Sequence, residues 1–265
     1  MRAEMEHWPA LGAVLAGATL VMCATWWVQV RTRNAGWVDV AWALLLAAAA
    51  VFYGAVGEGA DAPRLLAAGL GGAWGLRLGL HLFVRVRHES EDGRYRYLRQ
   101  HWQGDQRKFF GFFLFQALLV GLFSIPFLAV AMNPVPGLTA WSIAGVAVWA
   151  LALSGEALAD RQLARWRADP ANRGRTCRAG LWSCSRHPNY FFEWLQWFAW
   201  VLLAVGSPWW VWTLFGPLLM GASLLWVTGI PFTEAQALRS RGADYRRYQR
   251  EVSMFFPWFP KRAGT

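Results

Sequence analysis

The stretch SRHPNYFFEW, Ser185 to Trp194, leads the chain into one of its apolar segments. Pro188 suits the first turn of a helix, where its missing N–H would have no partner in any case. The N–H groups and positive dipole end of such a helix attract anions, and Arg186 adds a full charge. Asn189 and Glu193 are four residues apart and share one helix face. The motif predicts an amide and a carboxylate offered to a polar group, or else a cap in which Glu193 pairs with a loop arginine.

The composition is that of a membrane protein. Of the 265 residues, 56% are hydrophobic and only 16% are charged, against about 25% in soluble domains. A span needs about 20 apolar residues, and we expect seven spans at residues 7–30, 36–56, 65–84, 109–132, 138–158, 190–205 and 209–230. The predicted fold class is an all-α, polytopic integral membrane protein. We expect a single transmembrane domain over residues 1–265, with a polar tail at 231–265.

Lys and Arg are concentrated in segments that would share one side of the membrane. With the N-terminus outside, the outer segments hold only Arg2 and Arg64, so the positive-inside rule favours seven helices and a cytoplasmic C-terminus. The net charge of +10 then requires no nucleic-acid partner, although the arginines could hold an anionic ligand or anionic lipid headgroups. Glu4 and Glu6 stand where a signal peptide is basic, so we expect a retained first helix.

Two polar loops, residues 85–108 and 159–188, are long enough to be functional or disordered. Their aromatic and arginine content favours ordered, partly helical segments at the membrane interface, where they could also serve only as amphipathic anchors. Cys23, Cys177 and Cys184 have no metal-binding spacing, so we expect reduced thiols and no metal site.

Ionisable residues inside apolar spans are costly and usually functional. The chain has five: Asp39, Arg77, His81, Glu156 and Glu193. By the predicted topology all lie toward the cytoplasmic side, and they could line one cavity capped by the cytoplasmic loops. A structural ion pair between Asp39 and Arg77 is the simpler alternative.

Three segments carry a resemblance to a known family. GLWSCSRHPNYFFEWLQW (180–197) and VTGIPFTEAQALRSRGADYRRYQREVSMFFPWFP (227–260) resemble the C-terminal half of steroid 5α-reductases. WGLRLGLHLFVRVRHESEDGRYRYLRQHW (74–102) is similar to the uncharacterised bacterial relatives of those enzymes. The match covers most of the chain from Trp37 onward. The tail pattern is shared with sterol C14 reductases and isoprenylcysteine carboxyl methyltransferases.

The resemblance implies NADPH-dependent reduction of the 4,5 double bond of a 3-oxo-4-ene steroid or similar lipid enone. Hydride reaches C5, a proton reaches C4, and an acid group polarises the 3-oxo oxygen. In the reductases, a Gln-Glu pair at the start of the second helix and a Tyr on the third supply that group. Here Asp39 takes the place of the Glu, Val38 that of the Gln, and Trp74 that of the Tyr. Tyr95 or Tyr97 becomes a substitute donor if its loop folds back over the cavity.

The resemblance also assigns a cofactor site. The matching residues are Arg77, His81, Asp160, Arg167, Arg186, His187, Asn189, Tyr190, Glu193 and Tyr245. Arginines suit the pyrophosphate and 2′-phosphate of NADPH, and an amide or carboxylate suits the nicotinamide carboxamide. No GxGxxG motif follows a strand, so a Rossmann domain is excluded.

Two other functions stay open. One is an S-adenosylmethionine-dependent membrane methyltransferase; those enzymes carry a paired Glu-Glu where this chain has the single Glu234. The other is a lipid-binding or scaffold protein of the same fold that lacks the catalytic donor, as Val38 and Trp74 suggest. For the leading function we expect a monomer in a bacterial inner membrane or equivalent, with membrane lipids around it and a lipid enone entering from the bilayer.

Overall fold

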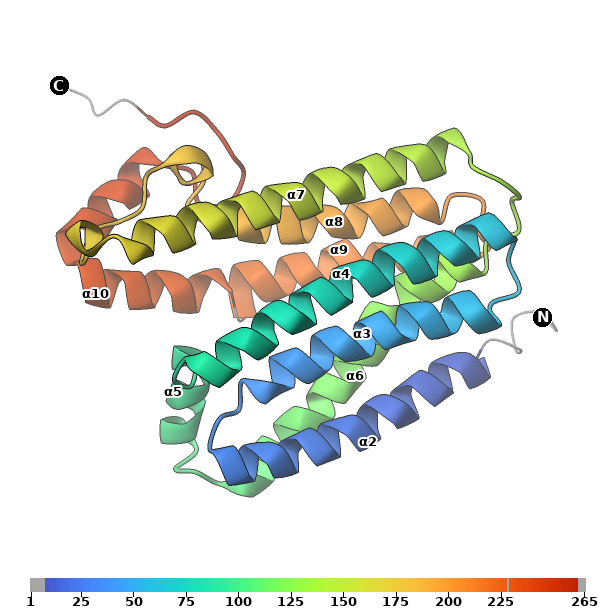
Figure 1. Ribbon diagram of the computed structural model, residues 1–265, viewed down its shortest axis with the longest axis horizontal. Helices are drawn as coiled ribbons and strands as arrows, with labels where there is room; N and C mark the ends of the chain where they lie inside the picture. The colour runs from blue at the N-terminus through green and yellow to red at the C-terminus, as the bar shows by residue number, and fades with distance from the viewer. Residues whose placement is uncertain (1–7, 228, 262–265) are drawn as a thin grey trace. The chain divides into compact units, whose positions relative to one another are not determined.

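The computed structural model describes residues 8–227 and 229–261, and within them every regular element is helical (Figure 1). The α-helices are α2 (Trp8–Thr32), α3 (Trp37–Val56), α4 (Asp61–His88), α5 (Gly93–His101), α6 (Gln106–Ala131), α7 (Ala140–Ala168), α8 (Pro188–Leu203), α9 (Phe215–Ala222) and α10 (Ile230–Glu251). Short helical turns lie at Pro170–Asn172, Gly180–Ser183, Trp210–Leu214 and Ser223–Val227. The all-helical class predicted from the sequence is confirmed.

Five helices of the described residues are long and apolar enough to cross a membrane. They are Trp8–Thr32, Trp37–Val56, Gln106–Ala131, Ala140–Ala168 and the run Trp210–Glu251. The expected third and sixth spans form α4 and α8, but α4 contains Arg77 and His81, and α8 has only 16 residues, fewer than the about 20 of a typical span. The apolar helices fit an integral membrane protein, and the predicted count of seven spans is not confirmed.

The chain divides into two compact units. The first combines the described residues of Met1–Ile143 with Trp200–Gly216, and the second combines Ala144–Ala199 with the described residues of Pro217–Thr265. Helices α2 to α6 therefore belong to the first unit, and α10 with most of α7, α8 and α9 belongs to the second. The single domain expected over the whole chain stays a prediction.

Glycines on one face of α4 bring this helix into close contact with α3. Gly71, Gly75 and Gly79 recur at every fourth position and therefore face the same way. A Cβ atom on Gly75 would lie 2.8 Å from the carbonyl oxygen of Ala43 and 2.9 Å from the backbone nitrogen of Ala47. Small residues at this spacing allow two membrane helices to pack backbone to backbone. The packing brings the start of α3 beside the end of α4.

In the second unit, the segment between α7 and α8 is ordered and partly helical, as the sequence predicted. The indole N–H of Trp182 donates to the carbonyl oxygen of Ala159 at 2.9 Å, and the backbone N–H of Leu181 donates to Gln162 Oε1 at 2.9 Å. The buried Tyr248 of α10 donates its hydroxyl to the carbonyl oxygen of Ser185 at 3.1 Å. Contacts with α7 and α10 thus hold the segment that leads into α8.

Gly75→Ala is expected to lower the thermal midpoint of the detergent-solubilised protein, because the added methyl group has to separate α3 from α4 against backbone atoms. Overpacking of this kind costs about 1–3 kcal/mol. Gly69→Ala in the same helix is the matched control, since no atom lies within 4 Å of its added Cβ. Equal midpoints for the two variants would contradict the close packing.

Candidate functional site

Two of the three predicted catalytic residues meet in the first unit. Asp39 lies in the first turn of α3, and its Oδ1 accepts a hydrogen bond of 2.6 Å from the hydroxyl of Tyr95 in α5. Arg94 Nη2 lies 3.3 Å from the other carboxylate oxygen. The segment that contains α5 therefore folds back onto the start of α3. Trp74 is buried and packs edge to face against Trp42, with ring centroids 6.3 Å apart.

Burial and neighbouring charges shift the pKa values of Asp92 and Tyr95. Asp92 caps α5 by accepting from the backbone N–H of Arg94 at 2.9 Å, and it also pairs with Arg85. Burial raises the pKa of Asp92, but the charges of Arg94 and Arg85 outweigh burial and lower that pKa below its usual value. Burial, with the negative charge of Asp39 as a further cause, raises the pKa of Tyr95 well above its usual value. Tyr95 therefore stays protonated and acts as a hydrogen-bond donor.

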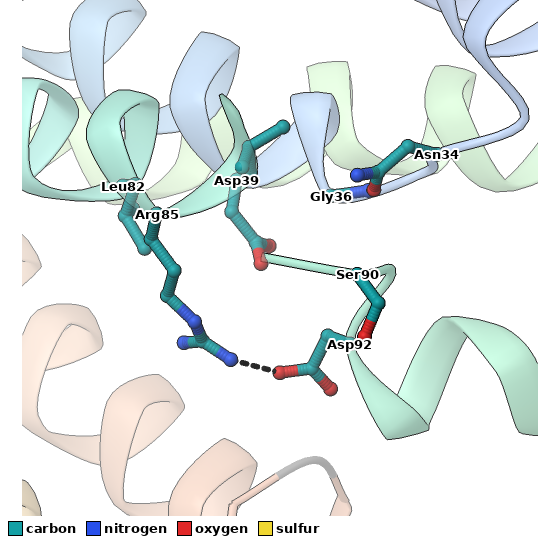
Figure 2. A pocket seen from close by; sticks show the side chains of 8 residues that line it. Asn34, Gly36, Asp39, Leu82, Arg85, Ser90 and Asp92 are labelled. Carbon is teal, nitrogen blue, oxygen red and sulfur yellow. Dashed lines mark hydrogen bonds and ion pairs between the residues drawn. The ribbon is translucent and has the colours of Figure 1, made fainter. Parts of the chain in front are cut away.

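A small hollow lies beside Asp39, between the start of α3 and the end of α4 (Figure 2). It is lined by Asn34, Gly36, Asp39, Leu82, Arg85, Val86, Ser90 and Asp92. Its volume of about 20 Å³ has room for about one water molecule. A larger molecule can reach Asp39 through this hollow only if the turn that holds Ser90 and Asp92 moves.

A second set of polar contacts fixes the same turn to α2. Arg99 donates to both oxygens of Glu91, at 3.1 and 2.7 Å, and its Nη2 also reaches Gln29 Oε1 at 3.3 Å. Glu91 in turn accepts from the backbone N–H of Ala35 at 2.8 Å. Gln29 is fully buried. Neither Glu91 nor Arg99 was predicted as a site residue, although both lie in the segment that carries the resemblance.

In the second unit, Glu234 of α10 gathers three predicted cofactor-binding residues. Its Oε1 lies 2.7 Å from Arg186 Nε, 3.4 Å from His187 Nε2 and 3.2 Å from the hydroxyl of Tyr245. Its Oε2 accepts from Gln249 Nε2 at 2.8 Å. Glu234 is the central residue that the site prediction missed, because in the sequence Glu234 stands out only as the single counterpart of a Glu-Glu pair.

Arg186 and His187 are both held inside the protein. Arg186 Nη1 donates to the carbonyl oxygens of Gln249 at 3.0 Å and Val252 at 2.9 Å, in addition to its contact with Glu234. The ring of Tyr190 stacks on His187 with centroids 5.5 Å apart. Burial lowers the pKa of His187, and its contact with Glu234 only partly opposes this effect. His187 is therefore neutral in the folded protein near pH 7.

The amide predicted at the start of α8 contacts α7. Asn189 Nδ2 donates to Asp160 Oδ1 at 3.2 Å. Glu193 lies one turn further along α8 and is partly buried. Tyr190 of the same turn shares a hydrogen bond of 3.1 Å with the hydroxyl of Thr233. An amide of α8 and a carboxylate of α7 are thus joined across two helices.

Two arginines lie near one buried thiol. Burial raises the pKa of Cys177, and the positive charges of Arg167 and Arg241 both oppose that rise. Arg167 is exposed at the end of α7, and Arg241 lies on α10. Two positive charges that both act on this thiol make its surroundings favourable for an anion.

The remaining predicted cofactor residues belong to the first unit. Arg77 is partly buried on α4, and His81, one turn later, is exposed. The other eight predicted positions all belong to the second unit. The structure thus groups the predicted residues into two sets, one in each unit.

The stability of the protein is expected to fall as the pH decreases below about 6.5. The unfolded chain takes up a proton at His187 near the usual pKa of 6.5, whereas the folded protein keeps the ring neutral because burial lowers its pKa. The stabilisation is complete above the unfolded-state pKa and is lost as the pH falls toward the folded-state pKa. Thermal midpoints as a function of pH measure this loss. His187→Gln should flatten the slope; an unchanged slope in this variant would refute the assignment.

Comparison with known proteins places the chain in a family. The profile of the family described as protein of unknown function DUF1295 matches residues 25–252. No curated protein and no solved structure matches the chain. Because the profile covers most of the sequence, the chain belongs to the DUF1295 family, a family of membrane proteins related to steroid 5α-reductases.

Proposed function

We propose that the chain is an NADPH-dependent membrane reductase of the 4,5 double bond of 3-oxo-4-ene steroids or similar lipid enones. The observation that carries the proposal is the 2.6 Å hydrogen bond from the Tyr95 hydroxyl to the Asp39 carboxylate. It joins a phenol and a carboxyl group, the two functions that the resemblance to steroid 5α-reductases implies. The phenol comes from α5, whereas Trp74 occupies the corresponding place on α4.

Enone reduction requires a donor at the 3-oxo oxygen, because negative charge develops there as hydride reaches C5. When bound, NADPH supplies this hydride and becomes NADP⁺, while a proton from water is added at C4. Tyr95 is the proposed donor to the 3-oxo oxygen, and its raised pKa keeps the phenol protonated. Its single O–H donates to Asp39 in the substrate-free structure, so this hydrogen bond is exchanged for one to the substrate oxygen when the turn that holds Ser90 and Asp92 moves to admit the enone. Asp39 orients the phenol, and Arg94 holds Asp39 in place.

The cofactor residues of the second unit differ in what they can offer NADPH. Arg167 and Arg241, which both act on Cys177, fit a phosphate group, since guanidinium groups bind phosphates through charge-assisted hydrogen bonds. Asn189 and Glu193 offer an amide and a carboxylate to a carboxamide. The Arg186 side chain already donates to Glu234 and to two backbone carbonyl groups. We therefore assign Arg186 to holding α8 and α10 together, in place of the phosphate contact first expected.

The proposed orientation has the N-terminus outside and the C-terminus in the cytoplasm, as the distribution of Lys and Arg favours. NADPH then reaches the basic loops from the cytoplasm, and a hydrophobic enone enters from the bilayer. We propose that the protein acts as a monomer surrounded by membrane lipids.

The first test uses the detergent-purified protein. Thermal midpoints are measured with NADPH, NADH and S-adenosylmethionine, and NADPH oxidation is then followed with progesterone or testosterone. Stabilisation by NADPH together with formation of the 4,5-dihydro product would support the proposal. Stabilisation by S-adenosylmethionine alone would instead favour the methyltransferase function.

Tyr95→Phe is expected to reduce turnover by about 10²- to 10⁴-fold, the usual contribution of a positioned proton donor. NADPH binding, measured by thermal shift, should be retained. Tyr97→Phe is the matched control, because Tyr97 lies in the same helix and is exposed. Unchanged turnover in Tyr95→Phe would exclude its role as the donor.

Arg167→Gln is expected to weaken NADPH binding by about 5- to 100-fold, because a charge-assisted contact contributes about 1–3 kcal/mol. Binding of NADPH is measured by fluorescence titration. Arg165→Gln, an exposed arginine in the last turn of the same helix, is the control and should change affinity little. Equal losses in both variants would indicate diffuse attraction in place of a specific contact.

A further inference from the structure

The second unit contains a cavity that the proposed reductase function does not use. Its volume is about 320 Å³, and it is lined by Arg178, Ser183, Arg247, Glu251, Val252, Pro260 and Lys261. Small-molecule pockets range from about 300 to 1,000 Å³. The cavity is an open depression of the surface, large enough for a small polar group, and none of its lining residues belongs to the predicted catalytic or cofactor set.

Positive charge exceeds negative charge in this cavity. Three cationic side chains, those of Arg178, Arg247 and Lys261, face a single carboxylate, Glu251. Glu251 pairs with Arg178 Nη1 and, at 2.7 Å, with Arg247 Nε. The backbone N–H of Lys261 donates to the carbonyl oxygen of Glu251 at 2.8 Å, which fixes the chain end that carries this lysine. Arg178 also pairs with Asp244, which lies outside the lining, at 3.4 Å. The three cations therefore exceed the two carboxylates by one positive charge, so the ligand should be an anion.

Aromatic side chains next to the cavity indicate where that anion comes from. Trp258 and Phe259 directly precede the lining residues Pro260 and Lys261, and they are 72% and 83% exposed. A backbone hydrogen bond of 2.9 Å from Trp258 to Cys184 holds the aromatic segment in place. Exposed Trp beside cationic side chains is typical of the boundary between lipid and water. An anion at this boundary belongs to a lipid headgroup.

We propose that the cavity binds the phosphate-bearing headgroup of an anionic phospholipid, with Trp258 and Phe259 embedded beside it in the membrane interface. Arg247 is the principal ligand, because its side chain is 64% exposed and its Nη groups make no hydrogen bond with the described residues. Lys261 supplies the second charge. A basic residue near an anionic membrane surface contributes about fivefold in affinity.

The test measures phospholipid binding to the full-length protein in neutral detergent by native mass spectrometry. We expect phosphatidylglycerol to bind more tightly than phosphatidylcholine. The double variant Arg247→Gln with Lys261→Gln should lose about 10- to 30-fold of the phosphatidylglycerol affinity. The matched control, Arg246→Gln with Arg250→Gln, removes two exposed charges of the same helix outside the cavity and should change the affinity less than about twofold.

Three results would overturn the proposal. Equal losses in the two double variants would mean diffuse attraction, and equal affinity for the two lipids would remove the need for an anionic headgroup. Displacement of phosphatidylglycerol by millimolar inorganic phosphate would assign the cavity to a soluble anion. Arg247→Lys keeps the charge and should retain binding, so it tests the site even if the double variant does not fold. None of these measurements depends on reductase activity.

Discussion

Two charges of this protein, one in each unit, lie at or just before the start of an apolar helix, and each is met by an opposite charge from another segment. An unpaired charge in an apolar interior costs several kcal/mol, so these contacts determine which segments pack together. Asp39 at the start of α3 pairs with Arg94 of α5. Arg186, just before α8, pairs with Glu234 of α10. In each unit, one ion pair thus attaches a polar segment to the first turn of an apolar helix.

The close packing of α3 on α4 positions Asp39 for its ion pair with Arg94. Because Gly75 allows backbone contact, the start of α3 and the end of α4 form one surface. The polar turn after α4 lies on that surface and is tied to α2 through Arg99 and the buried Gln29. The hydrogen bond from Tyr95 to Asp39 therefore depends on two sets of contacts. Small residues hold α3 against α4, and polar side chains hold the turn that leads to α5.

The sequence was sufficient to locate the apolar helices but not to assemble the site. The run expected at 36–56 is α3 at Trp37–Val56, and the run expected at 109–132 is α6 at Gln106–Ala131. Hydrophobicity identifies such helices because it is a local property. Glu234 lies 48 residues from Arg186, and no local pattern announces a contact that only tertiary packing creates. The motif that begins at Ser185 contains Arg186 but gives no sign of its partner Glu234.

Trp74 stands where the steroid 5α-reductases have a tyrosine, so another part of the fold has to provide the proposed hydrogen-bond donor. A phenol on a spanning helix is held by helix packing, as the resemblance to the reductases implies for the place that Trp74 occupies here. Tyr95 instead comes from a short helix between two longer ones, so polar contacts have to fix it. Electrostatic catalysis requires donors that are already in position. Under the proposed function, Glu91 and Arg99 therefore contribute to activity although they touch no reactant, because they hold the turn that carries Tyr95.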